Sequence, residues 1–509
     1  MSESLQAVLR RVLALGVAVL MLATLSAIAV VRADNRNGKN TSLASTNAGS
    51  TSGSSNSSSG GVSQGEAAST GAATASGPAA GSAATGAPSS GGSSAQVLGS
   101  QVTRPGSTGG GTSAGGSDPR LLPHNGTDCP DYNPNIGVFC DHYLIGGTTV
   151  LSGPLAVYGD QGLKAGQAWL AYYNSVIAPA QHLRNVKLIW YDDNLDPNKT
   201  LQYVQRLNEV DHVLYLAGIT SPEVASKYIQ TAKFPMIGDI GLSPKSYTND
   251  YIFPTAPSDL TRDPLRVKQA KERFGVKSFA VIQDVLPSVD TAPIQQAWKN
   301  GASQYGVSEA DYVEISSTAS DCSSQFSRVI AKKPEMLFLP TASGVMLACL
   351  REARKFSVQP GSSSSTWLKG WSGGSNLQVE VDNCKPTCEG MLSIGTIFSD
   401  PRTSQTPQMK TYVDNMAKYA PNVDITGFIA INYYHTGWVV FNLITQNHLQ
   451  NSLTRENLVN AANHFGPFDT GFGNIITWTP KLPREPWTCG YPVVVRGDKW
   501  VFETQKTCA

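Results

Sequence analysis

The chain has 509 residues, which allows about three domains of ordinary size, and its formal net charge at pH 7 is +1. A charge so close to neutral, with no basic stripe or arginine-rich arm, argues against a nucleic-acid partner. From 41 to 117 the sequence is almost wholly Ser, Gly, Ala and Thr, and such a segment cannot bury a core. We therefore expect roughly 390 residues to fold, enough for two lobes.

The N-terminal segment predicts export. Arg10 and Arg11 precede an uncharged run at 12–31, and Arg32 follows it. As a helix, a run of roughly 20 residues spans about 30 Å, the thickness of a bilayer core. Residues 1–33 can be a cleaved signal peptide or a retained signal anchor, and the length of the run favours the anchor. Both alternatives place the folded region outside the cytoplasm, at the cell surface or secreted.

The Ser/Gly/Ala/Thr-rich linker at 34–117 is expected to be disordered, because it has too little apolar area to offset its ordering entropy. A flexible chain of about 80 residues spans near 50 Å on average. It could hold a binding domain away from the membrane; the alternative is a tolerated linker without function. A short extension at 118–140 follows it.

Eight cysteines fit an exported chain, in which disulfides persist. Their order along the chain suggests four local bridges. The Cys384/Cys388 spacing would also suit redox or metal chemistry, but a metal site needs a second ligand pair and no histidine pair lies nearby. The expected bridges are Cys129–Cys140, Cys322–Cys349, Cys384–Cys388 and Cys489–Cys508.

Strand and helix patterns alternate from Tyr143 onward, which predicts an α/β fold with parallel sheets. Near the end, two short apolar runs flank Gly497-Asp498 and predict a β-hairpin. The predicted strands are 143–150, 186–191, 213–216, 279–282, 312–315, 336–339 and 391–397, with the hairpin at 493–496 and 499–502.

Several polar runs follow these strands, where α/β proteins bind ligands. LSGPLAVYGDQG (151–162) supplies the Gly and Pro of a sharp turn into a helix. In YDDNLDP (191–197) three carboxylates could suggest metal or acid–base work, but Asp196-Pro197 is typical of a helix start, so we expect a structural role. The other runs are AGITSPEVAS (217–226), PMIGDIGLSPKS (235–246) and KGWSGGSN (369–376).

These runs resemble the bacterial substrate-binding proteins of ABC importers, in the branched-chain amino acid and amide group. The resemblance implies the type I periplasmic-binding-protein fold: two Rossmann-like lobes with parallel sheets, joined by three crossover segments that could act as a hinge. It divides the chain into lobe 1 at 141–258 with 395–477, and lobe 2 at 259–394 with 478–509. The crossovers would be 255–258, 393–398 and 473–479.

The resemblance also implies ligand contacts. In relatives, the residue at the position of Tyr158 contacts the side chain of the ligand. Thr220 and Ser221 lie where relatives hold the carboxylate of the ligand. The alternative is that Thr220 and Ser221 only cap the following helix. Ser243 stands beyond Leu242, which occupies the place of an expected hydroxyl. Ser372, beside Trp371, stands where amino-acid binders carry an acid. A buried ammonium without a carboxylate is costly, so we expect a ligand without a free ammonium group. The implied ligand-binding set is Tyr158, Thr220, Ser221, Ser243, Trp371 and Ser372.

The sequence contains no H-E-x-x-H motif and no P-loop. We expect no catalytic residue, cofactor or metal. The leading hypothesis is an extracytoplasmic solute-binding protein. It would act as a monomer, take an amino acid derivative, amide or aromatic acid, and deliver it to an ABC permease. The alternatives are a tethered ligand-sensing module with a separate signalling partner, and a cell-surface structural or adhesion protein on a Ser/Gly stalk.

Overall fold

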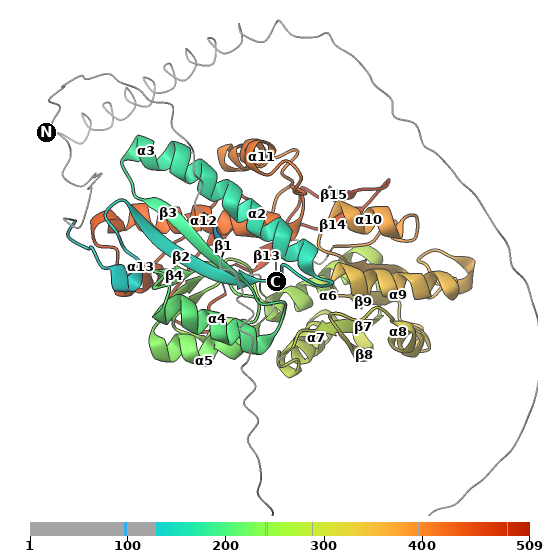
Figure 1. The fold of residues 1–509 in the computed structure, drawn as a ribbon. Helices are drawn as coiled ribbons and strands as arrows, with labels where there is room; N and C mark the ends of the chain where they lie inside the picture. The colour runs from blue at the N-terminus through green and yellow to red at the C-terminus, as the bar shows by residue number, and fades with distance from the viewer. Residues whose placement is uncertain are drawn as a thin grey trace, which may run out of the picture. The chain divides into compact units, whose positions relative to one another are not determined.

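The computed structural model describes residues 96–98, 129–239, 241, 243–287, 289–393, 398–485 and 487–508. Within these residues the chain forms two lobes, each an α/β unit built on a mainly parallel sheet (Figure 1). The α/β class predicted from the alternating patterns is confirmed. Residues 12–31, on which the signal or anchor prediction depends, lie outside the described part.

The first lobe is built on a six-stranded sheet in the order β1-β3-β2-β4-β5-β6. Its neighbours pair in parallel, except that β1 runs antiparallel to β3. The predicted strands at 143–150, 186–191 and 213–216 are found here with slightly different ends. The strands are β1 (Gln96–Leu98), β2 (His142–Thr149), β3 (Asn185–Asp192), β4 (Tyr215–Leu216), β5 (Met236–Ile237) and β6 (Ile252–Phe253).

Strand β1 corrects part of one expectation, because it lies within the linker for which disorder was predicted. Gln96–Leu98 pairs with Leu188–Trp190 of β3. An edge strand such as β3 presents unpaired N–H and C=O groups, and a short extended segment can satisfy them whatever its side chains. The rest of the linker lies outside the described residues.

Helices cover both faces of this sheet. Side chains of α2, α11 and α12 share one core with the sheet, and side chains of α4 and α5 form a separate core with it. In Figure 1, α2 and α12 lie side by side along the first of these faces. The helices are α2 (Ala156–Tyr172), α3 (Ala178–Gln181), α4 (Pro197–Glu209), α5 (Pro222–Ala232), α11 (Pro407–Tyr419), α12 (Phe428–Gln446) and α13 (Arg455–Ala462), with short strands β11 (Phe468–Asp469) and β12 (Ile475–Ile476).

The second lobe is built on a four-stranded parallel sheet in the order β10-β9-β7-β8. The predicted C-terminal hairpin is present as β14 and β15, and it joins this sheet through bridges that Leu392 makes to Ser372 and Val494. The strands are β7 (Ser278–Val285), β8 (Ser308–Ser316), β9 (Met336–Leu339), β10 (Gly370–Gly373), β13 (Cys489–Gly490), β14 (Val493–Val495), β15 (Trp500–Phe502) and β16 (Thr507–Cys508).

One prediction for this lobe is tested only in part, and one is wrong. Of the expected strand at 391–397 the structure describes 391–393, where Leu392 forms isolated bridges to Ser372 and Val494. The run at 369–376, expected to be a loop, contains the buried strand β10. A Cβ at Gly370 would lie 2.9 Å from the ring of Phe274, so packing demands glycine in this strand.

The helices of the second lobe also lie on both faces of its sheet. Side chains of α6 and α7 contribute to one core, and those of α8, α9 and α10 to another, which also includes the hairpin. The helices are α6 (Asp259–Phe274), α7 (Ala292–Tyr305), α8 (Ser323–Ile330), α9 (Ser343–Lys355) and α10 (Gln378–Cys384).

The packing near the last crossover favours a lobe boundary later than 477. Trp478 is buried in the core of the first lobe, and its Nε1 donates to Pro254 O at 2.9 Å. Arg484 Nη1 donates to Ile252 O at 2.6 Å, also in the first lobe. The lobe boundaries given by the sequence stay a prediction.

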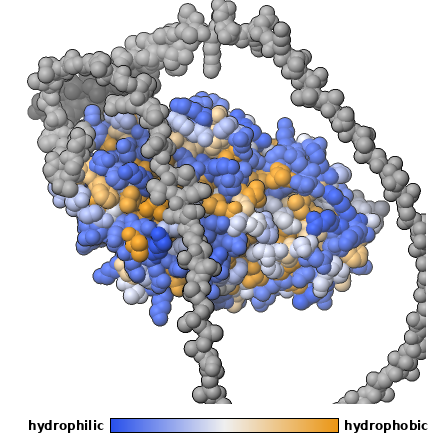
Figure 2. Space-filling view, viewed as in Figure 1, coloured by the Kyte–Doolittle hydropathy of each residue, from blue (hydrophilic) through white to orange (hydrophobic). Residues whose placement is uncertain are grey.

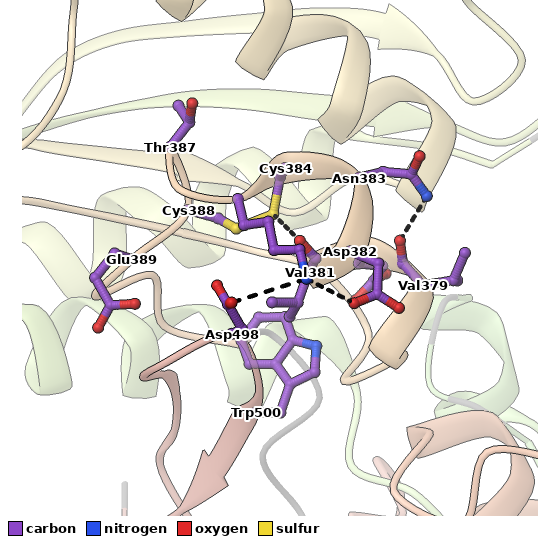
Figure 3. The surroundings of a disulfide bond; sticks show 12 residues. Val379, Val381, Asp382, Asn383, Cys384, Thr387, Cys388, Glu389, Asp498 and Trp500 are labelled. Atoms are coloured by element: carbon purple, nitrogen blue, oxygen red, sulfur yellow. Dashed lines mark hydrogen bonds and ion pairs between the residues drawn. A yellow bond between two sulfur atoms is a disulfide. The ribbon is translucent and has the colours of Figure 1, made fainter.

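The eight cysteines form the four expected disulfides. Figure 3 shows the Cys384–Cys388 bridge at the end of α10, beside Trp500 of the hairpin. Arg354 Nη2 donates to Cys384 O at 2.7 Å, and this contact fixes the turn to α9. The bridge therefore has a structural setting, in the core of the second lobe.

The surface is mostly hydrophilic on the face drawn in Figure 2, with smaller apolar areas between polar ones. No helix among the described residues is long and apolar enough to cross a membrane.

Candidate functional site

A cavity of about 160 Å³ lies between the two lobes. Its wall comes from the carboxyl ends of β2, β4 and β5 in the first lobe and of β7 and β9 in the second, with the first turns of α2, α6 and α12. Ligands bind at this place in parallel α/β sheets. Most of the wall is apolar, and it includes Val150, Leu155, Leu195, Ile219, Leu286, Val289, Ile294, Phe428 and Ile429.

The first lobe supplies Thr220, in the loop after β4, as predicted from the sequence. Thr220 lines the cavity. Its Oγ1 atom is buried and has no hydrogen-bond partner among the described residues. The backbone N–H of Thr220 donates to Thr148 Oγ1 at 3.3 Å. A buried hydroxyl without a partner is costly, so a ligand atom that bonds to it would gain affinity.

The carboxylates of the 191–197 run hold this loop in place, as the sequence predicts. Asp193 Oδ2 accepts hydrogen bonds from Thr148 Oγ1 and Thr200 Oγ1, both at 2.7 Å. Asp192 Oδ1 accepts from Leu151 N at 2.9 Å, and Asp196 caps α4 by accepting from Asn198 N at 2.9 Å. These contacts confirm a structural role for the run.

The predicted turn role of the glycines at 151–162 is also visible. Gly153 has a φ of +78°, which favours glycine. A Cβ at Gly159 would lie 1.8 Å from Val150 O, so only glycine lets α2 begin against the end of β2.

Tyr158 lines the cavity, but its hydroxyl group is held by the opposite lobe. It accepts a hydrogen bond from Ser343 N and bonds to Ser343 Oγ, at the first residue of α9. Ser343 Oγ also donates to Glu380 Oε1. Burial raises the pKa of Tyr158, so the hydroxyl stays protonated. Tyr158 therefore offers its ring to the cavity and its hydroxyl to the contact between lobes.

Glu380 anchors the second-lobe side of this contact. Its carboxylate accepts from Ser375 N at 2.9 Å and from Leu377 N at 3.2 Å. Burial raises the pKa of Glu380 to about 7. Ser375 also lines the cavity, and its carbonyl oxygen accepts from Phe428 N of the first lobe at 3.1 Å.

The second lobe presents polar groups at the ends of β7 and β9. Asp284 Oδ2 accepts from Ala342 N at 2.9 Å, and burial raises the pKa of Asp284 to about 7. Gln283 Oε1 and Thr341 Oγ1 are buried without a hydrogen-bond partner among the described residues. Like Thr220, these atoms are suited to bond a polar solute.

The first turns of α6 bring charges of both signs to the cavity. Arg262 and Arg266 line it together with Asp259. Asp259 Oδ1 lies 2.9 Å from Arg262 Nη2 and 3.7 Å from Arg266 Nη2, and Arg266 also pairs with the buried Asp263. Each guanidinium group thus has carboxylates beside it, which offsets the cost of burying its charge.

The predicted ligand contacts divide into two groups. Tyr158 and Thr220 line the cavity, whereas Ser221, Ser243, Trp371 and Ser372 are not among its lining residues. Ser243 Oγ donates to Glu223 behind the loop. Trp371 and Ser372 are buried in β10, in the body of the second lobe.

Ser372 is buried in β10 and does not line the cavity, and the expectation of a ligand without a free ammonium group stays a prediction. The cavity is reached by other carboxylates, namely Asp239, Asp259 and Asp284, which sequence reasoning missed. Their signal in the sequence was weak, because a single Asp after a strand or at a helix start has many structural uses. Ser375, three residues beyond Ser372, is the cavity residue of that run.

The described residues include no group of three or more His, Cys, Asp or Glu side chains that could hold a metal ion.

Comparisons with known proteins agree with this architecture. The family model described as periplasmic binding protein matches residues 143–499, which is more than half of the chain. No curated protein sequence matches the chain.

Solved structures that resemble the chain show the same fold at low identity. A leucine-binding protein from Thermotoga maritima is 16% identical with a TM-score of 0.60, over 72% of this chain and 98% of that one. A fatty acid ABC transporter substrate-binding protein from Thermomonospora curvata is 18% identical with a TM-score of 0.62, over 73% and 94%. A solute-binding protein from R. palustris, in complex with 4-hydroxybenzoate, is 17% identical with a TM-score of 0.59, over 72% and 97%.

The matched region spans both lobes and the cavity between them, and the resemblance predicted from the sequence is confirmed: the chain belongs to the periplasmic binding protein family.

Proposed function

We propose that the protein is an extracytoplasmic solute-binding protein that captures a small solute between its lobes and delivers it to an ABC importer. The observation that carries the proposal is the cavity lined by strand ends from both lobes. The family implies a location outside the cytoplasm. A membrane anchor at 12–31 would keep the protein near its permease.

The cavity wall favours a solute with a polar group and an apolar body. Thr220, Gln283 and Thr341 offer buried groups for hydrogen bonds, and aliphatic side chains form most of the remaining wall. Amino acid derivatives, amides and aromatic acids have this character. The resembling structures include proteins named for leucine and for fatty acids, and one that holds 4-hydroxybenzoate, which supports testing all three chemistries.

Calorimetry of the full-length protein against such a panel, with two matched threonine variants, tests the proposal. Thr220→Val keeps the side-chain shape and removes a hydroxyl of the cavity. We expect it to weaken binding of the solute roughly 2- to 12-fold, the range for one hydrogen bond, without lowering the melting temperature.

Thr200→Val is the control, because that hydroxyl bonds Asp193 behind the loop. Thr200→Val should lower the melting temperature, because it removes a buried hydrogen bond of the fold. It should leave the affinity for the solute within about twofold, because Thr200 does not line the cavity. If neither variant changes the affinity of a solute that binds, the site is elsewhere. If no solute of the panel binds, the proposed function is wrong for these chemistries.

A further inference from the structure

A second, smaller cavity of about 50 Å³ lies inside the first lobe, between α2, α12 and the sheet. We call it the annex. Its wall is mostly aromatic and aliphatic, with the rings of Trp169, Tyr173, Trp190, Tyr215 and Phe441. An apolar cavity of this kind stays dry and can accept apolar groups.

The annex borders the cavity between the lobes. Ala217, Tyr433 and Thr436 line both spaces. The hydroxyl of Tyr433 bonds to the side chain of Thr149, at the main cavity, and its ring centroid lies 6.1 Å from that of Trp190, in the annex. Tyr433 therefore stands between the two spaces, with its hydroxyl group at the main cavity and its ring at the annex.

Glycine residues help to keep the annex open. Gly166 of α2 lines it, and a Cβ there would meet nothing closer than Tyr433 Cδ1 at 3.9 Å. The space beside Gly166 is therefore unfilled, and an apolar ligand end could occupy it.

We propose that the annex is a subsite for the apolar end of the ligand. The polar group would stay at Thr220 and the strand ends, and an alkyl or aryl end would pass beside Tyr433 into the annex. At about 30 Å³ for each group of the size of water, the annex has room for roughly two methylene groups. This inference rests on the proposed function. It restricts the proposed ligands to small acids or amides that have an extended apolar end.

The test is calorimetry of the full-length protein with butanoate, hexanoate and octanoate. In the wild type the affinity should rise roughly fourfold for each methylene group that enters the annex, the factor expected for burying one such group. Gly166→Leu places a side chain in the annex, so it should abolish this gain and leave butanoate within about twofold.

Lys164→Leu is the matched control, a leucine on the same helix at a side chain that is 49% exposed. It should behave as the wild type. Leu163→Ala is a second variant, in case Gly166→Leu does not fold: it enlarges the annex, so octanoate should bind at least as tightly relative to butanoate as in the wild type.

Affinities that do not depend on chain length in the wild type would overturn this inference alone. A Gly166→Leu protein that weakens all three acids equally would do the same. Failure of these acids and of every solute in the wider panel would overturn the proposed function and this inference with it.

Discussion

The hydroxyl group of Tyr158 in the first lobe bonds to the backbone N–H and the hydroxyl group of Ser343 in the second. This contact closes one side of the cavity, and Glu380 supports it from behind. Tyr158 thus links the ligand chamber to the contact between lobes, and a change at this hydroxyl should alter ligand release more than the fold of either lobe.

Tyr158→Phe should weaken ligand binding roughly 2- to 12-fold, the range for one lost hydrogen bond, through faster dissociation. Stopped-flow measurement of association and dissociation rates checks this. Tyr172→Phe, on the same helix about 21 Å away along its axis, is the control and should change neither rate. An unchanged dissociation rate in Tyr158→Phe would show that the contact between the lobes is not needed to hold the ligand.

Asp284→Asn should change how stability depends on pH. Burial raises the pKa of Asp284 to about 7, against about 3.9 in an unfolded chain. The folded state therefore binds the proton more tightly, and the stability from this group is full below about pH 4 and lost as pH rises through about 7. Asp259 and Arg266 face this carboxyl group and are unchanged in the variant.

Urea unfolding of both proteins between pH 4 and 8 gives the measurement. The wild type minus variant difference in unfolding free energy should fall as pH rises. Two other buried groups also have shifted pKa values: the pKa of Glu380 is raised, and burial lowers the pKa of His435 to about 3. Both groups are present in both proteins, so their contributions to the unfolding free energy cancel from the difference. A difference that is constant or rises with pH would contradict a buried, proton-binding Asp284.

The four disulfides should differ in what they contribute. Cys322–Cys349 spans 27 residues and Cys384–Cys388 spans 4. Loop-closure entropy predicts a cost of about 3.5 kcal/mol for replacing the first pair by alanine and about 2 kcal/mol for the second. Equilibrium unfolding of the two double variants tests the order. A larger loss for the shorter loop would mean that strain or packing around Cys384 dominates.

Local patterns in the sequence were enough for much of the fold. The cap at Asp196 and the strand at 336–339 depend on neighbouring residues, and the cysteine pairs are close in sequence; all three were predicted correctly. Strand β10 was missed because Gly370, Trp371 and Gly373 lack the pattern of a strand. Their extended backbone is fixed by close packing against Phe274 and Met346.

The candidate site could be predicted only in part. The family resemblance of their runs implied Tyr158 and Thr220, and both line the cavity. Arg262, Arg266 and Asp284 reach the cavity because α6 and β7 of one lobe meet the strand ends of the other. Which face of a helix meets a second lobe is decided by tertiary packing, and the pattern of α6 alone does not reveal it.

The most direct test of the account is to fill the cavity. Ala342, at the start of α9, lines it from the second lobe, and Ala342→Trp would occupy ligand space. Thermal-shift measurements of the full-length protein across a metabolite panel should find solutes that stabilise the wild type. The account predicts that these solutes no longer raise the melting temperature of Ala342→Trp, although the variant folds. The same shift in both proteins would contradict a binding site between the lobes.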